Sequence, residues 1–210
     1  MAGRSSKKEA VLRRLVLLFS VVAVMLALGS GTALAEELVG TEGPDELIGG
    51  EGVDSISGLG DDDFLGGDPL RFGPGGGDLM VGGPGDDAVW GTSGDDLVFG
   101  GTGNDDIGGT VGSDVVYGDD GDDKVSSSYP FDLSSDSIFG GAGNDIMDAY
   151  NTVAVVDVVS CGTGDDLAYV DELDVVSDDC EAVVIGPEPD PDDLEFLTAP
   201  PNPLQIPTGS

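Results

Sequence analysis

Apolar and polar positions recur every nine residues through the middle of this chain. From Gly73 to Ser126 the chain divides without a gap into six nonapeptides, with Gly in the fourth place, Asp in the sixth and an apolar residue in the eighth. Places seven to nine are long enough for a short strand in which the eighth side chain points away from its two neighbours. The glycines before them favour a tight turn, because Gly accepts positive φ. The pattern predicts an all-β chain of alternating turns and short strands.

Two such turn-and-strand units make one flattened coil, so we expect residues eighteen apart to stack. Stacked strands lie about 4.8 Å apart. The eighth-place side chains would then fill a narrow core between two parallel sheets. The predicted core residues are Met80, Val89, Val98, Ile107, Val116 and Val125. The fold class is therefore a parallel β-roll (a β-solenoid).

The sixth-place carboxylates predict a calcium site. Stacking forms one column from Asp78, Asp96 and Asp114, and a second from Asp87, Asp105 and Asp123. Carboxylates about 5 Å apart repel by roughly 1 kcal/mol in water and by more near a protein surface. Ca²⁺ removes this repulsion and accepts six to eight oxygens, whereas Mg²⁺ demands a tight octahedron and softer metals prefer His or Cys. The turns add carbonyls around the fourth-place glycines Gly76, Gly85, Gly94, Gly103, Gly112 and Gly121.

The repeat G-G-x-G-x-D-x-U-x, with U apolar, resembles the RTX or hemolysin-type calcium-binding repeat. A single G-x-G-x-D would be weak evidence, but six in unbroken register are specific. The resemblance implies a calcium-binding β-roll that folds when calcium binds outside the cytosol. Many RTX proteins carry a C-terminal export signal and no cleaved leader, which differs from this chain.

Further repeats extend the pattern in both directions. A first block, 40–65, places Asp45 and Asp54 as ligands, and its last unit is expected to be one residue short, with Asp62 as ligand and Phe64 inward. Residues 66–72 then break the pattern and are expected to form a surface loop before the main block, 73–126.

A second interruption, 127–135, precedes a third block, 136–169. The expected calcium-site residues there are Asp136, Gly143, Asp145 and Asp166. The unit Ala149–Asp157 lacks the repeat Gly and Asp, so it is expected to keep a strand but to bind no calcium.

The two ends of the chain differ from the repeats. Five of the seven basic residues precede Leu15, an apolar run follows to Leu28, and Ala33-Leu34-Ala35 predicts cleavage of a Sec-type signal peptide, residues 1–35. The alternative is an uncleaved anchor helix, although the apolar run is shorter than the roughly 20 residues of a membrane span. The mature roll would occupy 36–185, and the proline- and acid-rich segment 186–210 would be a disordered tail.

The remaining charge excludes some functions. Without the leader the chain has 41 acidic and 2 basic residues, a net charge of −39, which excludes nucleic-acid binding. The absence of His excludes an HExxH metalloprotease and a Ser-His-Asp triad, and the repeats leave no room for a catalytic domain. We therefore expect no enzyme activity, although a paired-carboxylate glycosidase site stays formally open.

Two cysteines, Cys161 and Cys180, are the only ones in a chain expected to be exported. Export favours a disulfide over two free thiols. Their separation exceeds one coil by a single residue, so stacking would bring them close. We expect the disulfide to staple a C-terminal cap, because a solenoid end exposes unpaired strand edges.

An outward apolar stripe is expected on one side of the main block. Its members, in places seven and nine, are Leu79, Val81, Leu97, Phe99, Val115 and Tyr117. Such a stripe favours a homodimer or a protein partner, while strand propensity or cover by the chain's own insertions explains it equally well. The sequence thus predicts a secreted calcium-binding structural or interaction module, with an accessory or adhesive module of a cell-surface or polysaccharide-acting system as the alternative.

Overall fold

The structure, a computed structural model, describes residues 34–69, 75–127 and 132–186. Within these ranges the secondary structure consists of strands, and no helix there is long and apolar enough to cross a membrane. The predicted signal peptide and tail lie almost entirely outside the described residues.

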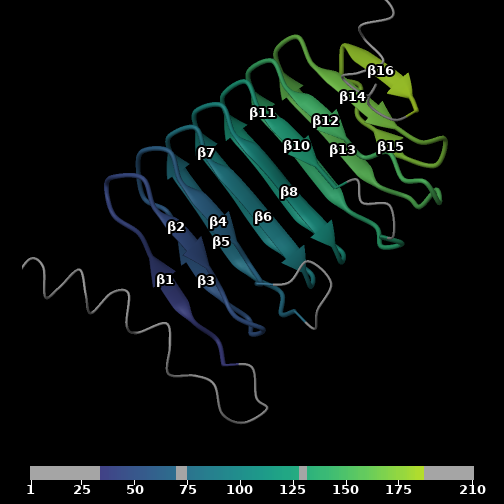
Figure 1. The fold of residues 1–210 in the computed structure, drawn as a ribbon. Helices are drawn as coiled ribbons and strands as arrows, with labels where there is room; N and C mark the ends of the chain where they lie inside the picture. Colours follow the sequence, from purple (N-terminus) through teal and green to yellow (C-terminus); the bar gives the residue numbers. More distant parts are fainter. Residues whose placement is uncertain (1–33, 70–74, 128–131, 187–210) are drawn as a thin grey trace, which may run out of the picture. The chain divides into compact units, whose positions relative to one another are not determined.

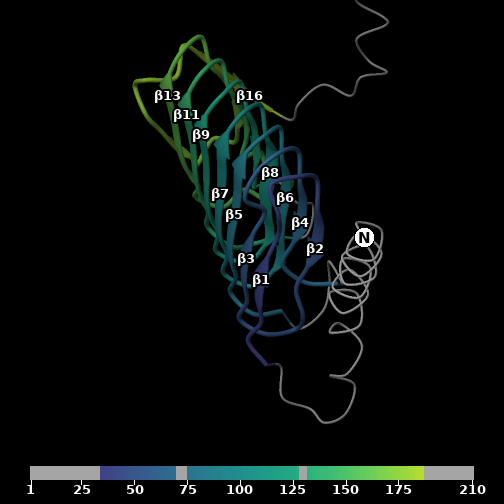
Figure 2. The ribbon, with the colours of Figure 1, turned by 90° about the vertical axis from the view of Figure 1, so that its left-hand side faces the viewer.

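The described strands form two parallel eight-stranded sheets that face each other (Figures 1 and 2). Strands alternate between the sheets, so we call them the odd sheet and the even sheet. The odd sheet contains, in spatial order, β1 (Glu37–Val39), β3 (Ser55–Ser57), β5 (Leu79–Pro84), β7 (Leu97–Thr102), β9 (Val115–Asp120), β11 (Ser137–Ala142), β13 (Val158–Thr163) and β15 (Val175–Val176). The even sheet contains β2 (Glu46–Ile48), β4 (Phe64–Gly66), β6 (Ala88–Ser93), β8 (Asp106–Val111), β10 (Lys124–Ser126), β12 (Ile146–Asp148), β14 (Leu167–Val170) and β16 (Ala182–Ile185).

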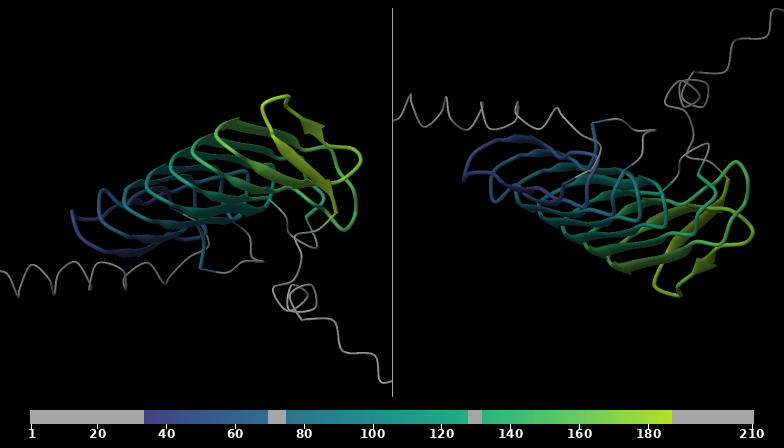
Figure 3. Two further views of the ribbon diagram at one scale, coloured as in Figure 1. Left: turned by 90° about the horizontal axis from the view of Figure 1, so that it is seen from above. Right: turned by 90° about the horizontal axis from the view of Figure 1, so that it is seen from below.

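This arrangement confirms the predicted β-roll. Met80 pairs with Val98 and Val98 with Val116, so residues eighteen apart stack through the main block. Figure 3 shows the coils following one another from the N-terminal to the C-terminal end of the roll. All six predicted eighth-place residues are fully buried, and one side chain from almost every strand fills the core.

The register of the third repeat was predicted wrongly. Leu65 is the buried residue of β4, with no exposed surface, whereas Phe64 is 43% exposed. The unit 58–66 therefore has all nine residues, with Asp63 in the sixth place. Asp61 occupies the fourth place with a φ of 67°, a left-handed conformation that Asp tolerates better than most non-glycine residues. The missing glycine made the unit look one residue short.

The strand expected within Ala149–Asp157 is also wrong. Those residues form no strand, and β13 begins directly after them at Val158. Asp157 is completely buried and stacks below Asp136, so it continues an aspartate column that the sequence pattern seemed to interrupt.

All extra residues lie along one edge of the roll. The turns from an odd strand to the next even strand form what we call the regular edge. There the sixth-place Asp lies nine residues after the sixth-place Asp of the preceding turn, as in Asp54 to Asp63 and Asp136 to Asp145. The turns from an even strand to the next odd strand form the insertion edge. Connections β4–β5, β10–β11 and β12–β13 are longer and all lie there.

Candidate metal centre

Each edge carries a continuous column of sixth-place aspartates joined by hydrogen bonds. The backbone N–H of each Asp donates to Oδ1 of the Asp in the following coil, for example Asp96 to Asp114 and Asp105 to Asp123, both at 2.8 Å. The insertion-edge column contains Asp54, Asp78, Asp96, Asp114, Asp136 and Asp157. The regular-edge column contains Asp45, Asp63, Asp87, Asp105, Asp123, Asp145 and Asp166.

The second carboxylate oxygen of most column residues has no partner. Oδ2 is buried without a hydrogen bond in Asp63, Asp78, Asp87, Asp96, Asp105, Asp114, Asp123, Asp136, Asp145 and Asp166. A buried charged oxygen without a partner is costly, and its cost grows when a like charge lies in the next coil. The same orphaned atom repeated along two columns indicates a positively charged group that binds there.

First-place glycines leave room beside these oxygens. A Cβ atom on Gly91 would overlap Oδ2 of Asp96 and the carbonyl oxygen of Gly109, and Gly100 stands in the same relation to Asp105 and Gly118. The orphaned carboxylate oxygen and the turn carbonyls therefore face one another without an intervening side chain. This combination of hard oxygens is what Ca²⁺ prefers in proteins.

The fourth-place glycines allow the turns to stack. Gly94 has a φ of 123° and Gly103 a φ of 133°, and a Cβ on either would overlap the backbone of the turn in the preceding coil. These residues therefore serve the backbone path, and the site uses the carbonyls that this path exposes.

Burial raises the pKa of the column carboxyls. On the insertion edge, desolvation raises the pKa of Asp96 and Asp136 to about 8 and that of Asp114 to about 7, against the hydrogen bond from the preceding coil. On the regular edge, the same cause raises the pKa of Asp105 to about 7 and that of Asp123 to about 6. Ionising these carboxyls in the folded chain at neutral pH therefore costs free energy, which a bound cation would offset.

Carboxylates alone do not form the site. Among the described residues, no three acidic or cysteine side chains form a ready-made metal cluster. A cation between coils would need backbone carbonyls as well as one or two carboxylates, and the glycine-rich turns provide them. The donor set therefore fits Ca²⁺, with its tolerance of mixed oxygen ligands and irregular geometry.

The family comparison agrees with this donor set. The model of the RTX calcium-binding nonapeptide repeat matches four times, at residues 30–65, 72–107, 106–128 and 133–151, and the matches cover just over half of the chain. The chain belongs to the RTX calcium-binding repeat family. No curated protein matches it in sequence. The repeats of this family bind Ca²⁺, so the resemblance and the calcium prediction are both confirmed.

The structure brings the predicted RTX ligands together, with one correction. Asp62 lies outside the carboxylate column, exposed, because the third repeat is one residue longer than predicted, and its neighbour Asp63 takes the column place. Asp45, at the N-terminal end, is only half-buried. That the other predicted aspartates bind calcium stays a prediction for each individual residue.

Sequence reasoning missed five buried carboxylates of this RTX roll, one of which, Asp171, lies in the β14–β15 connection. Asp63 and Asp157 belong to the columns, while Asp68 and Asp132 lie at the insertion edge beside them. For Asp63 the signal was the apolar residue two places later, Leu65. For Asp157 it was Val159, again two places later. Asp68 and Asp132 carry no repeat signal.

A second ladder lies outside the column on the regular edge, in the fifth place. Backbone N–H groups donate to Oδ1 of the residue in the preceding coil, from Asp86 to Asp62 at 3.0 Å and from Asn104 to Asp86 at 2.8 Å. The ladder continues through Asp122, Asn144 and Asp165. Asn therefore separates the carboxylates of Asp86, Asp122 and Asp165, which reduces their repulsion.

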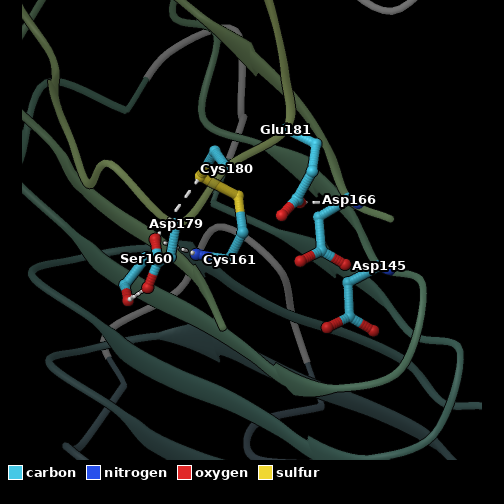
Figure 4. The surroundings of a disulfide bond; sticks show 7 residues. All are labelled: Asp145, Ser160, Cys161, Asp166, Asp179, Cys180 and Glu181. Carbon is cyan, nitrogen blue, oxygen red and sulfur yellow. Dashed lines mark hydrogen bonds between the residues drawn. A yellow bond between two sulfur atoms is a disulfide. The ribbon is translucent and has the colours of Figure 1, made fainter. Parts of the chain in front are cut away.

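The C-terminal end closes with acidic side chains and the disulfide. Cys161 and Cys180 are bonded, with Cα atoms 5.0 Å apart, as predicted (Figure 4). Asp174 accepts the N–H of Asp157 at 3.0 Å, and Glu181 accepts that of Asp166 at 3.1 Å. These side chains take the role that the next column Asp plays elsewhere in the roll.

The predicted apolar stripe lies on the outer face of the odd sheet. Phe99 and Tyr117 stack with ring centroids 5.0 Å apart, and Tyr117 stacks on Phe139 at 4.7 Å. Leu79 and Leu97 are 41% and 36% exposed, and Val81, Phe99, Val115 and Tyr117 are half-buried. Much of the stripe is therefore covered by its own neighbours.

Proposed function

We propose that this calcium-binding repeat protein is exported, folds when calcium binds outside the cytosol, and acts as a structural or interaction module without catalysis. The observation that carries the proposal is the double column of buried aspartates whose Oδ2 atoms have no partner. Such columns oppose folding when they are empty and favour it when they hold a dication.

The coupling of folding to calcium binding follows from the small hydrophobic core and the large negative charge of the roll. Most strands contribute a single side chain to the core, so apolar burial is small for a chain of this charge. A ligand that binds the folded state alone adds its binding free energy to folding stability. A low calcium concentration would leave the chain unfolded, and the higher concentration outside the cell would fold it.

Circular dichroism in the far ultraviolet tests this coupling on the chain from Glu36 onward. Titration with Ca²⁺ should convert a coil spectrum to a β spectrum, and Mg²⁺ at matched ionic strength should not. The double variant Asp96→Ala/Asp105→Ala should need far more calcium, whereas Asp106→Ala, which removes an exposed carboxylate from β8, should behave as the wild type. At about pH 7.5 or above, a β spectrum in the presence of a chelator would contradict the proposal.

Export is supported by the leader pattern at 1–35 and by the disulfide, since disulfides persist in oxidising compartments. The proposed division is a leader at 1–35, a roll at 36–185 and a tail at 186–210. Protein recovered from the culture medium should begin at Glu36 by N-terminal sequencing. An intact Met1 on cell-associated protein would instead support the uncleaved anchor.

The outer face of the odd sheet is the surface that we propose for contact with a partner. Leu79 and Leu97 remain exposed there, so we propose this face as the contact for a second copy of the chain, with an adhesive or accessory partner as the alternative. Sedimentation velocity with calcium should show a dimer that Leu79→Lys/Leu97→Lys abolishes. A wild-type monomer would remove the homodimer. The absence of His supports a non-catalytic role.

A further inference from the structure

The connection between β10 and β11, at the insertion edge, departs from the repeat in composition. Ser127 follows β10 in the place that Gly109 holds one coil earlier, because Ser126 pairs with Gly108. The described part of this connection, Ser127 and residues 132–136, contains no glycine. The glycine turn that exposes carbonyls elsewhere is therefore changed, although the column residue Asp136 is retained.

Two side chains of this connection are buried with an unpartnered oxygen. Ser127 is 1% exposed and its Oγ has no hydrogen bond; Asp132 is 4% exposed and its Oδ2 has none either. The other oxygen of Asp132 accepts the N–H of Ser134 at 3.1 Å, which fixes the carboxylate in a short local turn. The column residues Asp114 and Asp136 add an orphaned Oδ2 each.

The strand register places the buried Ser127 beside this group. In the preceding coil, a Cβ on Gly109 would overlap the carboxylate of Asp114, which lies five residues later in the same turn. Asp136 follows Asp114 in the column, and Ser127 follows Gly109 in the strand register. The register therefore places Ser127 at the first-place position, where the regular turns bring a glycine against the column carboxylate.

The charge of Asp132 affects the carboxyls of Asp114 and Asp136. It lies near enough to Asp114 and Asp136 to raise the pKa of both carboxyls, beside the larger effect of burial. A third buried carboxylate added to two that already repel would destabilise the turn further without a cation. No Lys or Arg lies among the described residues of this connection to compensate it.

We propose that Ser127 and Asp132 make the β10–β11 connection a calcium site of a second kind, in which side-chain oxygens replace the carbonyls of a glycine turn. The proposal rests on calcium binding by the RTX repeats and adds ligands from outside the repeat. The Ser127 hydroxyl, the Asp132 carboxylate and one column carboxylate would form a hard, flexible oxygen set, which favours Ca²⁺ over Mg²⁺. The inserted residues would then provide calcium ligands in a turn whose described part lacks the glycines of the repeat.

Native mass spectrometry of the full chain at saturating Ca²⁺ gives the ion count, and calorimetric titration gives the affinities. Asp132→Asn should bind one ion fewer than the wild type. Ser127→Ala should keep the count and weaken one site, on the order of tenfold, which corresponds to the loss of one oxygen contact. The matched control is Asp106→Asn, which removes one charge from an exposed position and should leave count and affinities unchanged.

The outcomes separate this inference from the proposed function. A wild type that binds no calcium would overturn both. A wild type that binds calcium, with Asp132→Asn and Ser127→Ala equal to it in count and affinity, would overturn the second kind of site alone. If Asp132→Asn does not fold, the weakened site in Ser127→Ala decides, because that variant keeps every carboxylate.

Discussion

The two edges of the roll reach the same aspartate column by different routes. On the regular edge, each column Asp from Asp63 onward lies nine residues after the insertion-edge Asp that precedes it in the sequence, and it follows a turn of constant length. On the insertion edge, the column passes through three longer connections and still keeps its hydrogen bonds at 2.7–2.8 Å, from Asp54 to Asp78 and from Asp114 to Asp136. The aspartate and the apolar residue two places later therefore define the coil, and the residues before them can vary.

The edges also differ in electrostatics. Burial raises the pKa of Asp96 and Asp136 on the insertion edge to about 8, whereas on the regular edge it raises that of Asp105 to about 7 and that of Asp123 to about 6. The pKa of Asp78, also on the insertion edge, rises only to about 6. Inserted carboxylates contribute to this difference, since Asp132 acts on Asp136 and Asp68 on Asp96. The insertion edge should therefore depend more on a cation than the regular edge.

The largest expected effect is on the pH dependence of the calcium-free chain. Eight of the column carboxyls have folded pKa values of about 6 to 8 against an ordinary 3.8, so the folded state binds more protons than the unfolded state. Without calcium, stability should rise as pH falls from about 8 to about 4, and should be lost as pH rises through the same range. Circular dichroism in chelator should show β structure appearing on acidification.

Two variants sharpen this test between the edges. Asp96→Asn should flatten the pH dependence from about 4 to about 8, and Asp123→Asn only from about 4 to about 6, because their folded pKa values differ. Equal responses of the two variants would contradict the difference between the edges. A calcium-free chain that stays unfolded at every pH would contradict the whole linkage.

A smaller effect is expected from the disulfide, which closes the last turn of the regular edge. The bond joins residues separated by 19 positions, and a loop of that size is worth about 3 kcal/mol in the chain-entropy model. Cys161→Ala/Cys180→Ala should lower the free energy of unfolding in urea with calcium by this amount. Ser160→Ala, which removes only a hydroxyl bonded to Asp179, should cost about 1 kcal/mol or less. An unchanged double variant would show that the cap does not limit stability.

The smallest effect concerns the fifth-place ladder of the regular edge. Asn104→Asp would place four carboxylates in consecutive coils, at 62, 86, 104 and 122, and should destabilise the roll by about 0.5 kcal/mol at low salt. Asn104→Ser, which introduces the residue that the insertion edge has at Ser113, removes the amide without adding charge. A cost for Asn104→Asp that persists in high salt would exclude charge repulsion as its cause.

The nonapeptide spacing predicted the roll, the stacking of Asp78, Asp96 and Asp114, and the buried residues of the main block, because each depends on a short local pattern repeated in register. The phase at Asp63 and Asp157 could not be obtained from glycines, since Asp61 adopts the left-handed turn conformation itself and the turn before Asp157 contains no glycine. The apolar residues Leu65 and Val159 were the better guide to phase. Asp68 and Asp132 reach the column only through the path of an insertion, which no periodicity encodes.

The most direct test of the calcium account is a crystal structure of the calcium-loaded chain. The account predicts calcium ions in both columns of the main block, with Oδ2 of Asp96 and Asp105 at about 2.3–2.6 Å from an ion and turn carbonyls completing each shell. Calcium bound away from the columns, with these Oδ2 atoms still without a partner, would contradict the central claim that the buried aspartates hold the ions.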